Sequence, residues 1–124
     1  MLHIPEAVQQ RLREAHNIWL ATVRPDSGPH LVPIWFVTFD DRIFICTAPA
    51  SVKVRNLQHN ARVALALEDG SHPVIIEGTA RVLSREQAPR PVVEQFKAKY
   101  DWDIRDDVEY SVVVEVTLMK WRGW

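Results

Sequence analysis

The sequence predicts a mainly β protein in which six antiparallel strands form a closed or split barrel. Short runs of β-branched and aromatic residues alternate with turn residues, a pattern that joins neighbouring strands as hairpins. Both faces of these runs are largely apolar, which favours a barrel over an open sheet with one solvated face. Helical segments do not alternate with single strands, so a parallel sheet of βαβ units is not expected.

The first part of the chain is expected to hold one helix and three strands. Residues 5–16 place apolar side chains on one helical stripe and polar ones elsewhere, which predicts a short helix that caps the barrel. A strand is expected at 18–24, and the turn sequence at 25–28 ends it. A long strand at 29–39 and another at 42–47 follow, separated by two aspartates. These segments predict an antiparallel meander.

The rest of the chain is expected to add two helices and three strands. Residues 50–57 have a helical pattern, and residues 62–68 alternate as a strand that ends in a turn. Further strands are expected at 74–83 and 111–119, with a helix at 85–100 between them. About three helices therefore flank six strands.

A proline and a glycine mark two local irregularities in these elements. Proline is tolerated only in the first turn of a helix, so the regular part of the helix at 85–100 is expected from Pro91 onward. Gly78 interrupts branched residues, which indicates a β-bulge or the close approach of another backbone or a ligand.

Composition places limits on function. The 124 residues suffice for one core, so a single domain is expected to span 1–124. The net charge of −1 provides no basic field for nucleic acid, and no apolar run approaches the ~20 residues of a membrane helix. With no apolar signal segment at the start, a cytoplasmic protein is expected. Cys46 is the only cysteine, which excludes an internal disulfide and favours a small buried side chain.

No metal site or hydrolase machinery is expected. The five histidines are scattered, and none pairs with another at ligand spacing on a helix face. Neither Ser27 nor Ser51 lies in a Gly-x-Ser-x-Gly turn. Four aspartates cluster between residues 101 and 107 without the ordered spacing of a calcium loop, so a solvated surface is expected there.

The clearest candidate site begins where the strand at 42–47 ends and the next helix starts. A helix N-terminus exposes unpaired N–H groups and the positive end of its dipole. Here Ser51 supplies a hydroxyl, and Lys53 and Arg55 supply two cations. The segment is either a phosphate-binding turn or a helix that Ser51 merely caps, with both cations in water.

A second candidate is the strand that contains His30, Val32, Pro33, Ile34 and Trp35. Pro33 cannot donate to a β-ladder, so this strand is expected at an edge or locally unpaired. Its free backbone groups could bind a planar heterocycle. Alternatively, the large side chains of this strand belong to the core or to a dimer interface.

The chain resembles the flavin-binding split barrels related to pyridoxamine-phosphate oxidase, and especially a compact subgroup that includes deazaflavin-dependent reductases. The resemblance covers most of the chain and depends on the order of several weak motifs. These are Leu20-Ala21-Thr22-Val23, Gly28-Pro29-His30, Val32-Pro33-Ile34-Trp35-Phe36, Lys53-Val54-Arg55-Asn56-Leu57, Arg62-Val63-Ala64-Leu65, Glu77-Gly78-Thr79-Ala80 and Trp121-Arg122-Gly123-Trp124.

The resemblance implies a six-stranded split β-barrel of the Greek-key, FMN-binding type. It also implies a homodimer with the cofactor in the groove between subunits, where Trp121 and Trp124 either wall the partner's site or pack the interface. The strand from His30 to Trp35 would lie along the ring system. Thr47, Ser51 and Lys53 would bind the phosphate, with Arg55 and Asn56 in support.

The function implied by the resemblance is that of an oxidoreductase. FMN, or alternatively the deazaflavin coenzyme F-420, would exchange hydride with a small conjugated acceptor, and no catalytic side chain can be named because the cofactor carries the chemistry. A flavin-binding carrier or sensor without turnover is the alternative. The sequence ends at Trp124, before the substrate-binding residues of true pyridoxamine-phosphate oxidases, so that activity is not expected.

Overall fold

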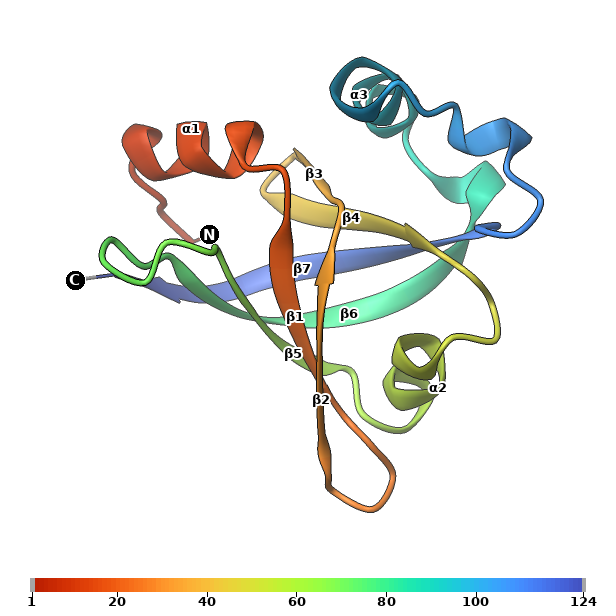
Figure 1. Cartoon of the computed structure of the whole chain (residues 1–124), viewed down its shortest axis with the longest axis horizontal. Coiled ribbons are helices and arrows are strands. Elements are labelled where there is room, and N and C mark those ends of the chain that lie inside the picture. The colour runs from red at the N-terminus through yellow and green to blue at the C-terminus, as the bar shows by residue number, and fades with distance from the viewer. Residues whose placement is uncertain (1, 124) are drawn as a thin grey trace.

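A computed structural model describes residues 2–123, which form a seven-stranded antiparallel sheet with the strand order β2-β1-β5-β6-β7-β4-β3 (Figure 1). The two edge strands, β2 and β3, are consecutive in the chain, and no ladder joins them within the described residues. The sheet is therefore curled but not closed, which confirms the predicted antiparallel split barrel. The strands are β1 (Ile18–Val23), β2 (Pro29–Ile34), β3 (Val37–Phe39), β4 (Arg42–Thr47), β5 (Arg62–Ala66), β6 (Ile75–Ser84) and β7 (Val112–Arg122).

Three α-helices surround the sheet, as expected: α1 (Glu6–Glu14), α2 (Val52–His59) and α3 (Arg90–Tyr100). The expected helix at 85–100 is interrupted. Its first part is the 3-10 turn η1 (Arg85–Gln87), and α3 starts only after Pro89. A second 3-10 turn, η2 (Ile104–Asp106), was not predicted. No helix within residues 2–123 has the length and apolar character needed to cross a bilayer.

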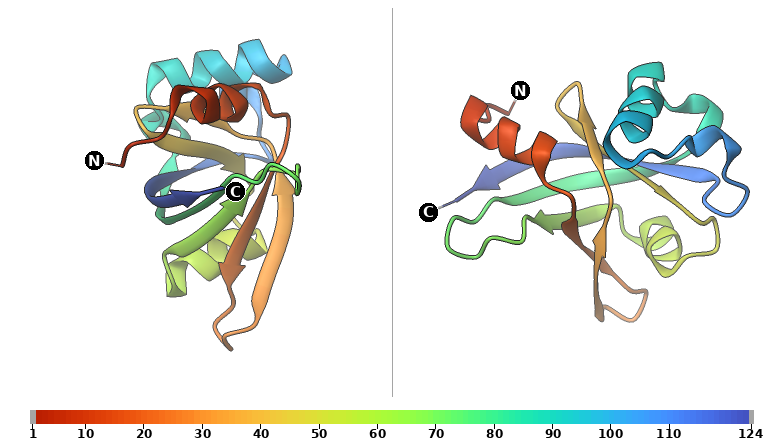
Figure 2. Two further views of the ribbon diagram at one scale, coloured as in Figure 1. Left: turned by 90° about the vertical axis from the view of Figure 1, so that its left-hand side faces the viewer. Right: turned by 45° about the horizontal axis from the view of Figure 1, so that its top comes forward.

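The prediction of one continuous strand at 29–39 is wrong, which is why the sheet has seven strands rather than six. β2 pairs with β1 at one edge of the sheet, whereas β3 pairs with β4 at the other edge. The chain leaves the ladder at Trp35 and Phe36 to cross between the two edges. Figure 2 shows the hairpin of β1 and β2 extending away from the other strands.

The apolar residues form two clusters, one on each side of β4. Ile43 and Ile45 face the barrel interior, where side chains of β1, β5, β6 and β7 meet those of α1 and α2. Phe44 and Cys46 face the opposite way and pack under α3, η2 and β7. Because both faces of β4 are buried, its sequence is a continuous apolar run and does not alternate between apolar and polar residues.

Gly78 lies at an irregularity in the ladder, as the sequence predicted. The register between β6 and β7 shifts between Glu77 and Gly78. A Cβ atom placed on Gly78 would overlap the carbonyl oxygen of Thr117 and would come within 3.0 Å of a methyl carbon of Val116. The position therefore requires glycine because the backbone of β7 approaches too closely for any side chain.

We expect Gly78→Ala to lower the free energy of unfolding by about 1 to 2 kcal/mol, because the added methyl must push two hydrogen-bonded strands apart. Urea denaturation followed by circular dichroism measures this effect. Gly70→Ala is the matched control, since no atom lies within 4 Å of a Cβ at Gly70. Equal stability of the two variants would contradict this account of the bulge.

Candidate functional site

A cavity of about 600 Å³ lies where β2 ends, α2 begins and the chain leaves α3. These segments are far apart in sequence, so the barrel fold assembles the cavity. Half of the ten predicted site residues line it, and they come from both candidate segments. They are Pro33, Ile34, Trp35, Thr47 and Lys53.

Ser51 caps α2. Its Oγ accepts a hydrogen bond from the backbone N–H of Val54 at 3.4 Å, and the hydroxyl of buried Thr47 donates to the same oxygen at 3.4 Å. Within residues 2–123, the backbone N–H groups of Val52 and Lys53 have no described partner. The cap is thus present, and it leaves two donors at the positive end of the helix dipole.

Lys53 is a half-buried cation that has no counter-ion within residues 2–123. Its side chain lines the cavity and makes no hydrogen bond or ion pair with any described residue. Burial lowers the pKa of its ammonium group. Arg55 lies on the exposed face of α2 and does not line the cavity. Of the two predicted cations, Lys53 alone faces this space.

His30 and Val32 are half-buried residues of β2 and do not line the cavity. The Nδ1 atom of His30 is buried and has no hydrogen-bond partner among the described residues. Burial, together with the nearby charges of Arg24 and Lys53, lowers the pKa of His30. β2 is an edge strand, as predicted from Pro33, so one side of its backbone has no neighbouring strand.

Asn56 links α2 to the barrel instead of lining the cavity. Its side chain is buried, and its amide donates to the hydroxyl of Thr22 on β1 at 2.9 Å.

We expect Asn56→Ala to lower the free energy of unfolding by about 1 to 2 kcal/mol, because the buried Thr22 hydroxyl loses its partner. Thermal unfolding tests this, with exposed Gln58→Ala as the control. An equal effect of both substitutions would contradict the assigned link.

Four aromatic side chains form part of the cavity lining, and the sequence analysis did not identify the main one, Tyr100. The ring of Tyr100, the last residue of α3, stacks on Trp35 with 4.4 Å between centroids and 6° between planes. Trp102 meets the edge of this pair at 6.0 Å from Trp35, and Tyr110 meets Trp102 at 5.9 Å. All four residues line the cavity.

The Tyr100 hydroxyl occupies the place where the ladder is interrupted. It accepts a hydrogen bond from the Phe36 N–H at 3.0 Å and lies 2.8 Å from the carbonyl oxygen of His16 and 3.0 Å from that of Phe36. The ammonium of Lys99 also donates to the Phe36 carbonyl, at 2.9 Å. Side chains of α3 thus satisfy the backbone at the bend between β2 and β3.

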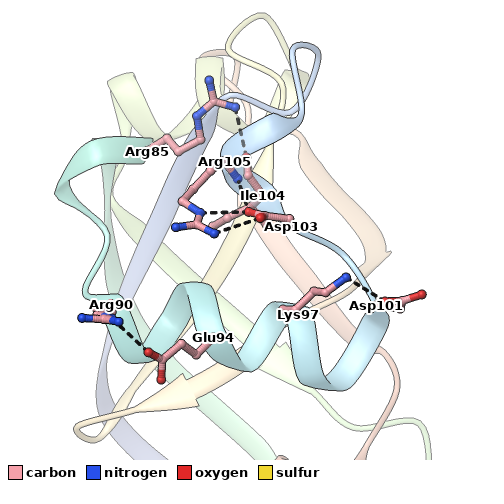
Figure 3. A network of polar contacts seen from close by, with 8 residues as sticks. All are labelled: Arg85, Arg90, Glu94, Lys97, Asp101, Asp103, Ile104 and Arg105. Carbon is pink, nitrogen blue, oxygen red and sulfur yellow. Dashed lines mark hydrogen bonds and ion pairs between the residues drawn. The ribbon is translucent and has the colours of Figure 1, made fainter.

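Three of the four aspartates between residues 101 and 107 pair with neighbouring groups, and Figure 3 shows two of them, Asp101 and Asp103. Asp101 pairs with Lys97 at 2.9 Å, and Asp103 pairs with Arg105 at 2.9 Å. Asp107 accepts hydrogen bonds from the indole of Trp102 and from two backbone N–H groups, which lower the pKa of its carboxyl. No group of three potential metal-ligating side chains lies within residues 2–123.

Two further predictions concern single residues. Cys46 is buried, as expected, and burial raises the pKa of its thiol to about 11. Trp121 packs against the barrel interior, and its indole donates to the carbonyl of His3 at 3.0 Å. Trp124 lies outside the described residues. The role of Trp121 at a partner's site stays a prediction.

Comparison with known proteins identifies relatives of this fold. A protein of Mycobacterium tuberculosis, strain CDC 1551 / Oshkosh, named as an F-420H(2)-dependent biliverdin reductase, is 33% identical over 92 residues, or 72% of this chain and 66% of that protein. The match thus spans just under two thirds of that relative.

Two solved structures superpose on nearly the whole chain. An F-420 reductase has a TM-score of 0.78 at 21% identity and covers 96% of this chain and 98% of its own. A conserved hypothetical protein of Mycobacterium tuberculosis has a TM-score of 0.78 at 26% identity and covers 99% and 86%. The pyridoxamine 5'-phosphate oxidase family matches residues 4–124, and the chain therefore belongs to that family.

Proposed function

We propose that the chain binds the phosphate of a flavin or deazaflavin at the N-terminus of α2 and works as an oxidoreductase. The observation that carries this proposal is Lys53, a half-buried cation that faces a cavity of about 600 Å³ and has no counter-ion among the described residues. Partial burial of a charge without a counter-ion costs free energy, so such a site favours the binding of an anion.

The surrounding residues fit a phosphate. The hydroxyls of Thr47 and Ser51 and the backbone N–H groups of Val52 and Lys53 lie at the same helix end. Near Lys53, the buried Nδ1 of His30 has no hydrogen-bond partner among the described residues, although His30 does not line the cavity. In this proposal Ser51 keeps its role as helix cap while its oxygen also contacts the ligand, and Arg55 and Asn56 support the site without touching it.

A planar ring system would lie along β2, whose edge offers backbone groups that no neighbouring strand uses. Such a cofactor supplies hydride chemistry, and the protein supplies binding and orientation, so the absence of an acid/base pair is no obstacle. The names of two relatives, an F-420H(2)-dependent biliverdin reductase and an F-420 reductase, support F-420 as a candidate cofactor. FMN remains the other candidate.

We also propose that the chain forms a homodimer through the outer face of β1 and β2. Trp19 and Leu31 are 36% and 61% exposed, and the register places both on this face, next to Pro33 and Ala21. A large exposed apolar face is typical of an interface. Light scattering is expected to give a dimer mass, and Leu31→Lys is expected to yield monomers.

Titration of the purified chain with FMN and with F-420 tests the proposed function. We expect saturable binding of one of them, followed by reduction of a small quinone by the reduced complex. Binding without turnover on a panel of acceptors would favour a carrier or sensor instead. Failure to bind either cofactor would refute the proposal.

A further inference from the structure

We propose that His30 is a proton-linked part of the phosphate site at the N-terminus of α2. Its ring takes up a proton when the phosphate binds, so affinity for the cofactor rises as the pH falls. The role rests on the proposed function and adds a pH-sensitive group to the same site. It also assigns His30 to the phosphate, whereas the family resemblance assigned it to the ring system. The position of His30, the charges around it and its unpaired nitrogen carry the inference.

His30 faces the side of the β1–β2 hairpin that α2 covers (Figure 1). The register pairs His30 with Thr22, and paired residues of an antiparallel ladder share one face of the sheet. Thr22 is buried on that face, where its hydroxyl accepts the hydrogen bond from Asn56 of α2 at 2.9 Å. The side chain of His30 therefore lies beside the contact between hairpin and helix.

Lys53 lies on the same side of α2 as Asn56. The two residues are three positions apart in the helix, a spacing that brings side chains to one face. Because Asn56 binds this face to β1, Lys53 reaches the hairpin one turn nearer the helix N-terminus. The charge of Lys53 acts on His30. Burial, with the charges of Arg24 and Lys53, lowers the pKa of the imidazole.

The charged groups that face His30 are cations. Arg24 follows β1, and its guanidinium donates to the carbonyl of Pro29, the residue before His30, at 2.6 Å. Asp26 is the only carboxylate of the hairpin, and α2 contains none. Asp26 accepts a hydrogen bond from the Gly28 N–H at 2.9 Å in the turn and is not among the charges that alter the pKa of His30.

The other titratable groups of α2, Arg55 and His59, are exposed. Protonation of His30 thus adds a charge beside Arg24 and Lys53, and no carboxylate offsets it. This repulsion disfavours the charged ring as long as the site holds no anion. A bound phosphate reverses the balance, because it supplies negative charge near all three cations.

The Nδ1 atom of His30 is buried and has no hydrogen-bond partner among the described residues. A protonated ring donates from both nitrogens, and a phosphate oxygen is an acceptor for such a donor. Phosphate therefore binds the protonated ring more tightly than the neutral one. By linkage, it raises the pKa of His30 by the same free energy, and one proton changes affinity by at most about tenfold per pH unit.

The direction of the pH dependence follows from the two pKa values of His30. Affinity is constant above the pKa of the complex and rises as the pH falls below it. It levels off below the pKa of the free protein, which burial and the two cations hold below the usual value for histidine. A phosphate monoester loses one negative charge below about pH 6, which opposes this rise. Comparison with a variant that lacks the imidazole isolates the part due to His30.

NMR spectroscopy of the histidine rings in the unsubstituted protein tests the proposal directly. The His30 resonances are followed against pH in the free protein, with saturating riboflavin, and with saturating FMN or F-420, whichever binds. The phosphorylated cofactor is expected to move the His30 midpoint up by about one pH unit or more, and riboflavin by less than about 0.3. Exposed His59 is expected to keep its midpoint.

His30→Asn is the matched variant, since its amide keeps a polar group near the position of Nδ1 and does not titrate between pH 5.5 and 8. Between these limits, the affinity of the unsubstituted chain is expected to rise at least about threefold more than that of His30→Asn. His59→Asn removes an exposed histidine of the same helix and is expected to keep the full pH dependence.

An unchanged His30 midpoint in the saturated complex would overturn the proton-linked role while the proposed function stands. The same conclusion would follow if His30→Asn kept the pH dependence of the unsubstituted chain. If neither FMN nor F-420 binds at any pH, the proposed function is refuted, and the role of His30 falls with it.

Discussion

Lys53→Met is expected to weaken binding of a phosphate-bearing cofactor about tenfold to hundredfold, or ~1 to 3 kcal/mol, the scale of a charge-assisted hydrogen bond. Methionine keeps a long apolar stem of similar size, so the substitution removes the charge and preserves most of the side-chain volume. Lys53 has no partner among the described residues, so the substitution leaves no orphaned carboxylate. The chain itself is expected to keep its stability.

The measurement is a titration of the intrinsic tryptophan fluorescence with FMN and with riboflavin, which differ only in the phosphate. The deazaflavin without its phosphate gives a second comparison, and it also lacks the groups that F-420 carries on that phosphate. Lys53→Met is expected to lower affinity only for the phosphorylated member, whereas the exposed Lys120→Met is expected to alter neither. If the unsubstituted chain binds both members equally, the phosphate is not bound at Lys53.

The strands could be predicted because their signals are local. The strand at 42–47 has the predicted bounds, and the bulge at Gly78 follows from one glycine within branched residues. The interruption at Trp35 and Phe36 could not be found in this way, because both residues continue an apolar run that suits a strand. What breaks the strand is the pairing of β2 and β3 with opposite edges of the sheet, together with hydrogen bonds from Tyr100, more than sixty residues later.

At the candidate site, too, residues with local sequence signals could be predicted, whereas a residue brought in by long-range contacts could not. Thr47, Ser51 and Lys53 lie within a few residues of a strand end and a helix start, so local spacing indicated them. Tyr100 is the last residue of α3, and its sequence neighbours gave no reason to separate it from an ordinary helix end. The one available signal was the group of aromatic residues at 100, 102 and 110 around an acidic loop. Only the fold shows that this loop faces the end of β2.

Tyr100→Ala is expected to lower the free energy of unfolding by about 2 to 4 kcal/mol, somewhat below the range for fully buried aromatic residues because Tyr100 is half-buried. The substitution removes the stack on Trp35 and the hydroxyl that satisfies the backbone of Phe36. Tyr100→Phe removes only the hydroxyl, and its expected cost is about 1 to 2 kcal/mol. Urea denaturation followed by circular dichroism measures both.

A double-mutant cycle separates the two roles of Tyr100. Tyr100→Leu combined with Trp35→Leu is expected to show a coupling of about 0.5 to 1.5 kcal/mol, the contribution of an aromatic pair beyond its buried area. Tyr110→Phe is the control for the hydroxyl, since the Tyr110 hydroxyl makes no hydrogen bond with a described residue, and it is expected to change stability by less than about 0.5 kcal/mol. If Tyr100→Phe is equally neutral, the hydroxyl does not stabilise the bend between β2 and β3.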